Sequence, residues 1–383
     1  MSGSRGVDEV VFSRPYRAPG ELANLEAVLR SDHSHGDGDF TRSATERLRA
    51  LSGAPHALLT TSCTHALEMA GLLLGLGPGD EVVLPSFTFP SAATAVVARG
   101  AVPVFVDIDP LTGNIDPNQV AEALTPRTRA VTVMHYGGVP VDLDAVLAVT
   151  EPAGIALVED NAHGLGGAYG ERMLGSAGVM ATQSFHDTKN VHCGEGGALL
   201  VNDAVLFRRA EILREKGTDR ARFLRGEVDK YTWQDQGSSY LPSELNAAVL
   251  DAQLAEFETI QAARHRVWNA YAAALGEWAD AQGVRLMSSD PGLQHTAHLF
   301  YLVMPGHEGQ QALIAHLRTH GVRATFHYVP LDTSPAGEHF GRRLTRLGRT
   351  AEFSRRLVRL PLWAGLDDAQ VERVIEGVLS YRP

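Results

Sequence analysis

Lysine and cysteine are scarce in this 383-residue sequence. Among 34 basic residues only Lys189, Lys216 and Lys230 are lysine, and the other 31 are arginine. Such an excess of arginine is typical of a GC-rich coding sequence, so each surviving lysine is a candidate for a specific role. The two cysteines, Cys63 and Cys193, lie too far apart for a Cys-x-x-Cys metal or redox pair, and two cysteines exclude a disulfide scaffold.

Long apolar runs and an excess of basic charge are also missing. No run approaches the roughly 18 apolar residues of a membrane-spanning helix, and residues 1–16 lack the order of a signal peptide. We therefore expect a soluble protein of the cytoplasm with no membrane partner. The net charge of −11 argues against nucleic acid as a partner, because duplex binding needs a basic face. The hydrophobic fraction of 44% excludes a disordered chain.

The first two-thirds of the sequence alternates short apolar runs with helical patterns, which predicts an α/β domain. Strands are expected at residues 56–62, 81–85, 102–107, 130–135, 155–159, 179–185 and 198–201. Helices are expected at residues 64–76, 90–99, 117–124, 143–149 and 204–215. Strands separated by helices of this length form a largely parallel sheet with both faces covered.

The rest of the sequence predicts a smaller α+β domain. A long helix is expected from Ser243 to about Leu275, bounded by Pro242 and Gly276. Beyond it, strands are expected at residues 298–304 and 322–328 and helices at residues 310–320 and 367–379. We place the large domain, with the N-terminal segment, at residues 1–250 and the small domain at residues 251–383.

Polar residues follow two of the predicted strands, where open α/β sheets bind their ligands. Thr61-Ser62-Cys63-Thr64 starts a helix, which suits either a phosphate or an ordinary N-cap made by Ser62 or Thr64. Glu159 and Asp160 end another strand. Acidic residues there fit a metal site, a cap or a partner for a cationic ring.

Lys189 follows a third strand, and the glycine-rich turn at residues 193–197 comes next. An exposed lysine is neutral only about 0.04% of the time at pH 7, but a desolvated lysine becomes a usable nucleophile. A solvated surface charge and a plain hairpin turn would also explain this segment. Taken together, the helix start, the strand-end carboxylate and the strand-end lysine are the set that pyridoxal phosphate requires.

Three segments around these residues resemble a known family: Glu159-Asp160-Asn161-Ala162-His163, Ser184-Phe185-His186-Asp187-Thr188-Lys189-Asn190 and Gly194-Glu195-Gly196-Gly197. They are similar to the fold-type-I pyridoxal-phosphate enzymes of the sugar-nucleotide aminotransferase (DegT/StrS) group, and the resemblance covers nearly the whole chain. It implies a large domain with a mostly parallel mixed sheet plus a smaller C-terminal α+β domain. Further stretches resemble the dTDP-4-amino-4,6-dideoxygalactose transaminase branch, at residues 214–218, 228–233, 237–241, 326–331 and 334–341.

The resemblance also implies roles for single residues. It makes Lys189 the lysine that binds the cofactor as a Schiff base, and Asp160 the partner of the pyridinium nitrogen. Phe89 matches the aromatic residue that stacks on the cofactor ring. The phosphate cradle matches Cys63 (through its backbone), Thr64 and Ser184.

The sequence departs from the family pattern at two positions. His163 stands where most members have Gln near the phenolic oxygen of the cofactor. Because imidazole titrates near neutrality, His163 could give the enzyme's activity a different pH dependence. The alternative is that His163 is a structural histidine. Ser239-Tyr240-Leu241 stands where members commonly have Asn-Tyr/Phe-Arg. The resemblance makes Ser239 a contact to the cofactor phosphate of the neighbouring subunit. It also places the loop at residues 32–39 over the sugar site, and we assign no metal to its histidines and aspartates.

The resemblance implies transfer of an amino group from L-glutamate to dTDP-4-keto-6-deoxy-D-glucose. The product is a dTDP-4-amino-4,6-dideoxyhexose, galacto or gluco, for antibiotic or polysaccharide biosynthesis. A homodimer with shared active sites is implied as well. An aminotransferase for another keto-sugar nucleotide and a non-enzymatic sugar-nucleotide binder stay open. A related family of sugar dehydratases has His at the lysine position, so Lys189 argues against a dehydratase. No Gly-x-Gly-x-x-Gly motif follows the first strand, so a nicotinamide dehydrogenase is poorly supported.

Overall fold

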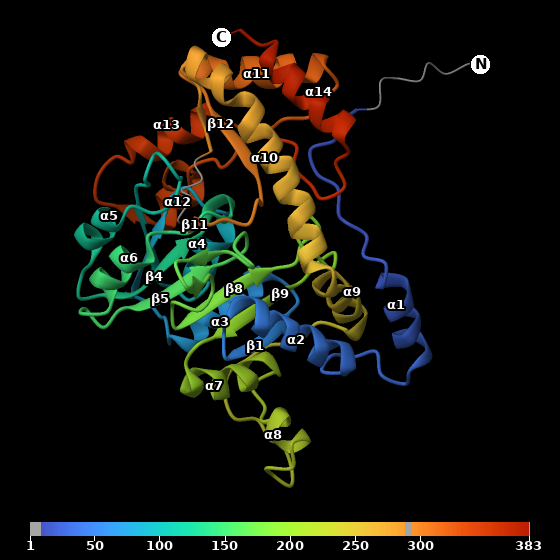
Figure 1. Cartoon of the computed structure of the whole chain (residues 1–383). Helices are drawn as coiled ribbons and strands as arrows, with labels where there is room; N and C mark the ends of the chain where they lie inside the picture. The colour runs from blue at the N-terminus through green and yellow to red at the C-terminus, as the bar shows by residue number, and fades with distance from the viewer. Residues whose placement is uncertain (1–8, 288–292, 383) are drawn as a thin grey trace.

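The computed structural model describes residues 9–287 and 293–382, and its centre is an eight-stranded sheet (Figure 1). The strand order is β1-β9-β8-β5-β4-β2-β3-β13. Every strand of this sheet is parallel to the others except β9, which runs against both of its neighbours. The strands are β1 (His56–Thr60), β2 (Glu81–Pro85), β3 (Val102–Val106), β4 (Thr128–Met134), β5 (Ala156–Asp160), β8 (Met180–Ser184), β9 (Gly197–Val201) and β13 (Arg342–Arg343).

Helices cover both faces of the large sheet, and the residues of its central strands are buried on both sides. One face packs against α2 (Asp39–Ser52), α5 (Pro117–Ala123), α6 (Leu143–Thr150) and α9 (Glu244–Ala255). The opposite face packs against α3 (Cys63–Leu73), α4 (Pro90–Val97) and α7 (Ala204–Arg214). Two further helices, α1 (Glu21–Arg30) beside α9 and α8 (Arg220–Leu224) on an arm below α7, lie at the periphery (Figure 1).

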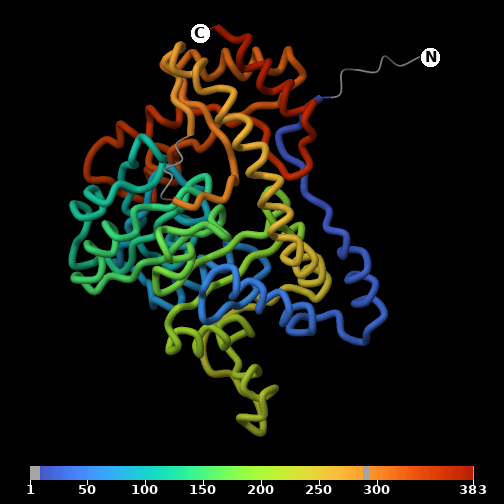
Figure 2. The backbone as a smooth tube through the Cα atoms, in the orientation of Figure 1, coloured from blue at the N-terminus to red at the C-terminus, as the bar shows by residue number. Residues whose placement is uncertain are grey.

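The C-terminal third forms a second layer above one end of the large sheet (Figures 1 and 2). Its three-stranded sheet has the order β10-β12-β14, with β10 (Arg285–Leu286), β12 (Phe300–Val303) and β14 (Leu357–Leu360). This sheet shares a core with α10 (Phe257–Gln282), α11 (His307–Thr319) and α14 (Asp368–Leu379), while α12 (Pro335–Phe340) and α13 (Gly348–Arg356) lie between the layers. A third, small sheet has the order β11-β6-β7, with β11 (Leu293–Gln294), β6 (Ala168–Tyr169) and β7 (Arg172–Met173).

Most of the predicted strands and helices are confirmed, but two predictions are wrong. The long helix does not stop at Gly276; it breaks at Glu256 and then continues as α10 to Gln282. A single helical glycine costs only about 1 kcal/mol, and the buried residues of α10 on both sides of Gly276 outweigh that cost. Residues 322–328 form no strand, since their ladder contacts are limited to two single bridges, from Val322 to Val10 and from Thr325 to Arg359.

The two layers are linked along the chain at several points. The first turns of α10 pack with the large sheet through Phe257 and Ile260, whereas Val267 and later residues belong to the core of the second layer. The short strand β13 comes from the C-terminal third but joins the edge of the large sheet beside β3. Val10 lies in the core of the second layer. The division of the chain at about residue 250 stays a prediction.

None of the helices within residues 9–287 and 293–382 has both the length and the apolar character needed to cross a membrane.

Candidate active site

Asp160 and Lys189 meet at the carboxyl edge of the large sheet. Asp160 is the last residue of β5, and Lys189 lies in the loop at residues 185–196 that joins the adjacent strand β8 to β9. Successive side chains of a strand point to opposite faces, so Glu159 and Asp160 have different surroundings. Glu159 is fully buried and accepts hydrogen bonds from the backbone N–H groups of residues 175, 177 and 178. Glu159 is therefore structural, and Asp160 faces the cavity described next.

A cavity of about 400 Å³ brings together most of the predicted cofactor residues. We call it the Asp160 cavity. Six of the eight predicted positions line it: Cys63, Thr64, Phe89, Asp160, Ser184 and Lys189.

The start of α3 forms one wall of the Asp160 cavity. The hydroxyl of Ser62 caps this helix by accepting the N–H of His65 at 3.1 Å, so the predicted N-cap is confirmed. Ser62, Cys63 and Thr64 also line the cavity, and the phosphate site predicted there stays a prediction. Burial raises the pKa of the Cys63 thiol to about 12, and the nearby Asp160 adds to the rise. The thiol thus stays protonated and donates to the hydroxyl of Thr182 at 3.5 Å, so the backbone N–H of Cys63 is its group left for a phosphate.

Gly197 explains part of the glycine-rich turn. A Cβ atom at this position would lie 2.4 Å from the backbone nitrogen of Cys63 and 2.4 Å from the carbonyl carbon of Ser62. Real Cβ atoms essentially never come this close to backbone atoms, so only glycine lets β9 approach the start of α3. The glycine-rich turn therefore does more than connect β8 to β9, because Gly197 sets how closely β9 approaches the wall of the Asp160 cavity.

A second cavity of about 500 Å³ adjoins the first and shares Phe89, Thr188, Lys189 and Tyr328 with it. We call it the Arg359 cavity. Its other lining includes His163, which follows β5, Phe12 and Ser13 from the N-terminal segment, and His298, His327 and Arg359 from the C-terminal layer.

Burial sets the protonation of the two central groups. It lowers the pKa of Lys189 to about 8, against the opposing attraction of Asp160. Burial raises the pKa of Asp160, while the backbone N–H of Ala162 and the charge of Lys189 act in the opposite direction. At a pKa near 8, about 10% of the amine is neutral at pH 7, compared with about 0.04% for an exposed lysine. Lys189 is therefore a far better nucleophile and base than a surface lysine.

His163 lies among neutral imidazoles. Its ring stacks on that of His298 with 3.9 Å between centroids, and its Nδ1 accepts the N–H of Gly137 at 3.3 Å. Burial, followed by His298 and Lys189, keeps the pKa of His163 well below its ordinary value. The ring is thus neutral around pH 7 with its proton on Nε2. The distinct pH dependence considered from the sequence is not expected from this residue.

Ser239 and the other two lysines lie away from both cavities of the single chain. Ser239 is exposed and bridges to Glu215, and the phosphate contact predicted for it stays a prediction for the neighbouring subunit. Lys216 pairs with Glu215 at 2.7 Å on the surface, and Lys230 is exposed. Of the three lysines, Lys189 alone lines these cavities.

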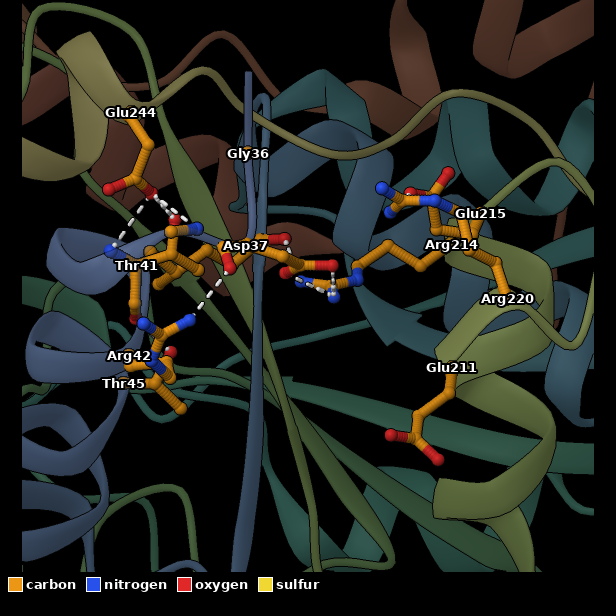
Figure 3. Close-up of polar contacts among 12 residues, drawn as sticks. Gly36, Asp37, Thr41, Arg42, Thr45, Glu211, Arg214, Glu215, Arg220 and Glu244 are labelled. Carbon is orange, nitrogen blue, oxygen red and sulfur yellow. Dashed lines mark hydrogen bonds and ion pairs between the residues drawn. The ribbon is translucent and has the colours of Figure 1, made fainter. Parts of the chain in front are cut away.

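The loop at residues 32–39 packs against the starts and ends of neighbouring helices (Figure 3). The carboxylate of Asp37 accepts both of its hydrogen bonds from Arg214, at 2.7 and 2.9 Å. Glu244 accepts the backbone N–H groups of Gly38 and Thr41 at 3.0 and 3.1 Å. The loop lines neither cavity of its own chain, so its placement over the sugar site stays a prediction.

Several residues of the site were not predicted from the sequence. Arg359 has a detectable signal, because it is the one charge in the apolar run Leu357-Val358-Arg359-Leu360-Pro361-Leu362. His327 and Tyr328 belong to a segment noted for its resemblance, but nothing in the sequence indicates that they meet Lys189. His298 has no sequence signal of its own.

The Asp160 cavity fits a planar, phosphorylated aldehyde with a cationic ring nitrogen. Asp160 is 3% exposed, and within the described residues no Lys, Arg or His side chain forms an ion pair with it, so its carboxylate is available to a charged ring N–H. The ring of Phe89 is 54% exposed despite its size and offers an apolar face. The N–H groups at the start of α3 suit a phosphate, and the amine of Lys189 suits the aldehyde.

A mixed α/β sheet with this site at its carboxyl edge defines a pyridoxal-phosphate enzyme of fold type I. The comparison with known families agrees: residues 16–379 match the DegT/DnrJ/EryC1/StrS aminotransferase family. The chain belongs to this family and is an aminotransferase with pyridoxal phosphate as its cofactor. The narrower assignment to the dTDP-4-amino-4,6-dideoxygalactose transaminase branch stays a prediction.

Individual proteins of the family resemble the chain over nearly its whole length. The spore coat polysaccharide biosynthesis protein SpsC of Bacillus subtilis is 33% identical over 96% of this chain and 95% of its own. The crystal structure of the aminotransferase TlmJ from Streptoalloteichus hindustanus has a TM-score of 0.89 and 31% identity, covering 97% of this chain and 98% of TlmJ. DesV of S. venezuelae, solved in complex with a ketimine intermediate, has a TM-score of 0.86 and 31% identity, covering 96% of this chain and 100% of DesV.

Proposed function

We propose that this aminotransferase moves the amino group of L-glutamate to the C4 carbonyl of dTDP-4-keto-6-deoxy-D-glucose. The product is a dTDP-4-amino-4,6-dideoxyhexose of galacto or gluco configuration, used to build a deoxyamino sugar. The observation that carries this function is the position of Lys189, whose amine lies in the wall common to two cavities. One cavity fits the cofactor, and the other has room for a substrate beside the same amine.

When bound, pyridoxal phosphate supplies an electron sink for the carbanion formed next to the exchanged nitrogen. Asp160 would hold the ring nitrogen in its protonated form, and Phe89 would pack on the ring face. Thr64 and Ser184, with the backbone of Cys63, would bind the phosphate. The Nε2–H of His163 would donate a hydrogen bond to the phenolic oxygen.

Lys189 would handle the protons of both half-reactions. Its amine takes the proton from the α-carbon of glutamate in the first half and returns a proton to C4 of the sugar in the second. A base of this kind works best when its pKa lies near the operating pH, and burial brings the pKa of Lys189 to about 8. The side chain of Lys189 would serve in both half-reactions because it lies in the wall common to the two cavities.

We also propose a homodimer in which each site is completed by the partner. Support comes from the arm at residues 218–239, which projects from the body in Figures 1 and 2. Several large apolar side chains of this arm are exposed. Trp233 is 80% exposed and Leu224 is 57% exposed. Ser239 lies at the end of this arm, where it would reach the phosphate of the neighbouring site.

The test is the NMR spectrum of the product formed from dTDP-4-keto-6-deoxy-D-glucose and L-glutamate. We expect an amine at C4, with the coupling constants of the C4 proton distinguishing galacto from gluco. An amine at another carbon, or turnover only with a different nucleotide, would favour the alternative of another keto-sugar nucleotide. A chain that binds the sugar nucleotide without exchanging nitrogen would favour the binder.

A further inference from the structure

Arg359 places a cation in the wall of the cavity that adjoins Lys189. It lies in β14, where Val358 and Leu360 point into the core of the second layer. Side chains alternate along a strand, so Arg359 points to the other face and lines the Arg359 cavity. Burying a charged side chain in such an apolar strand is unfavourable unless the charge is compensated.

In the part of the chain that the structure describes, the guanidinium of Arg359 has no hydrogen-bond or ion-pair partner. Its Nε is buried and makes no hydrogen bond, and within residues 9–287 and 293–382 no carboxylate lies within ion-pair distance of it. The guanidinium carbon lies over the ring of Phe12, 4.7 Å from the ring centroid. Arg264, the other deeply buried arginine nearby, instead donates to the carbonyl oxygens of Ala297, His298 and Leu362. An unpaired buried donor is costly, and a ligand that supplies an acceptor would remove the cost.

The charges around Arg359 favour an anion. Among residues 9–287 and 293–382, no Asp or Glu lines the Arg359 cavity, whereas Lys189 does. The three histidines of the wall are His163, His298 and His327, and burial keeps the pKa of each well below the ordinary value, so they are neutral donors or acceptors. The cavity is thus locally cationic in a chain whose net charge is −11.

We propose that Arg359 binds the carboxylate of the amino-acid donor, and of the oxo acid that it becomes, an inference that rests on the function proposed above. Arginine suits this task because its fork of N–H groups matches a carboxylate with two parallel hydrogen bonds.

The diphosphate of the sugar nucleotide is an alternative anion for this arginine, but connectivity favours the carboxylate. The carboxylate of an α-amino acid is bonded to the very carbon whose proton Lys189 removes. The diphosphate is attached at C1 of the sugar, on the far side of the ring from the C4 carbonyl. A cation beside Lys189 therefore meets the carboxylate in the first half-reaction and an uncharged part of the sugar in the second.

The test uses the cofactor-loaded protein and two probes that do not react. Glutarate carries the carboxylates of the donor without its amine, and dTDP carries the diphosphate without the sugar. Both are titrated by calorimetry into the native protein, Arg359→Gln, Arg359→Lys and the control Arg355→Gln, which removes an exposed arginine from the preceding helix. The cofactor absorbance of each variant confirms that it is folded and loaded.

We expect Arg359→Gln to weaken glutarate binding at least tenfold and up to about 100-fold, since charge-assisted hydrogen bonds are strong. Arg359→Lys should fall between Arg359→Gln and the native protein, because it keeps the charge and loses the fork. The control should bind glutarate normally, and all variants should bind dTDP with the native Kd. Equal glutarate affinity in Arg359→Gln and the native protein, absence of glutarate binding in the native protein, or a loss confined to dTDP would overturn the inference.

A second readout separates this inference from the function on which it rests. With L-glutamate alone, the rate of amino transfer to the cofactor is followed by absorbance, and Arg359→Gln should need at least tenfold more glutamate for half its maximal rate. If the native protein transfers no nitrogen from glutamate but its glutarate binding still depends on Arg359, the proposed reaction is wrong and the carboxylate site stands.

Discussion

Lys189 is the residue on which the proposed chemistry depends. Replacing it with Ala should lower the steady-state transamination rate at least about 10³-fold, because the nucleophile and the acid–base group are lost together. The measurement is the release of 2-oxoglutarate in the presence of the keto sugar. Lys230→Ala, which removes an exposed lysine outside both cavities, should keep the native rate. Substantial ping-pong turnover by Lys189→Ala would refute the assignment.

The lowered pKa of Lys189 predicts how the cofactor-free protein takes up pyridoxal phosphate. Only the neutral amine attacks an aldehyde, so the rate should rise with pH, reach half of its maximum near pH 8 and level off above about pH 9, where the amine is about 90% deprotonated. Stopped-flow absorbance between pH 6 and pH 11 gives the midpoint. A midpoint near 10.4, the value of a free lysine, would show that the site does not desolvate the amine.

The sequence predicts the residues of the Asp160 cavity better than those of the Arg359 cavity. Asp160, Lys189 and Cys63 all follow strands of one sheet, and the carboxyl ends of parallel strands meet at one edge, so their proximity follows from the pattern alone. His298, His327 and Arg359 come from the C-terminal layer. Their approach to Lys189 depends on how that layer sits on the sheet, and no local pattern encodes that placement.

At the scale of elements, two glycines with opposite roles give a matched pair of predictions. Gly197→Ala should lower the free energy of unfolding by about 1–3 kcal/mol, because the added Cβ meets the backbone of Ser62 and Cys63 and forces β9 away from α3. Gly276→Ala should raise it by about 0.5–1 kcal/mol, because the position is helical and open space surrounds it.

Urea denaturation of the two variants and the native protein, loaded with cofactor, measures both effects. Gly197→Ala should also weaken the binding of pyridoxal phosphate, since the start of α3 moves with β9, whereas Gly276→Ala should leave cofactor affinity unchanged. Equal stabilities for the two variants would mean that the close approach at Gly197 is not a constraint.

Element types were more predictable than element ends and partners. Seven of the eight strands of the large sheet are confirmed, because most of them are short apolar runs and that pattern is local. The eighth, β13, was not predicted, because its two arginines carry no strand pattern. The predicted end of the long helix was wrong because the cost of one helical glycine is smaller than the stabilisation from the buried face of α10 beyond Gly276. Residues 322–328 have a strand-like pattern but lack a ladder partner over most of their length, and pairing is a property of the neighbours. The reversed direction of β9 also leaves no mark in its own sequence.

At the scale of the whole molecule, the homodimer proposal predicts that two inactive variants restore each other. Lys189→Ala removes the amine of one site, and Ser239→Glu places a negative charge where the partner's site would bind phosphate. In a mixed dimer, one site receives an intact Lys189 and an intact Ser239 from different chains. Co-refolded equal mixtures should therefore recover about one quarter of native activity, since about half of the dimers are mixed and each has one intact site.

Activity of the separate variants and sedimentation of each sample serve as controls. A mixture that stays as inactive as its parents, while sedimenting as a dimer, would place Ser239 outside the neighbouring site. A chain that sediments as a monomer with full activity would contradict the shared site altogether.

The reversal of β9 has a consequence for the order in which the site is assembled. Because β8 and β9 are adjacent and antiparallel, the loop that carries Lys189 closes between near neighbours in sequence, and a short closure costs little entropy. Cys63 and Arg359 reach the same place only through contacts that span more than a hundred residues, and such contacts form slowly. The lysine loop can thus form while the amine is still solvated. Burial lowers the pKa of Lys189, so the amine acquires its larger neutral fraction only when the fold that buries it is complete.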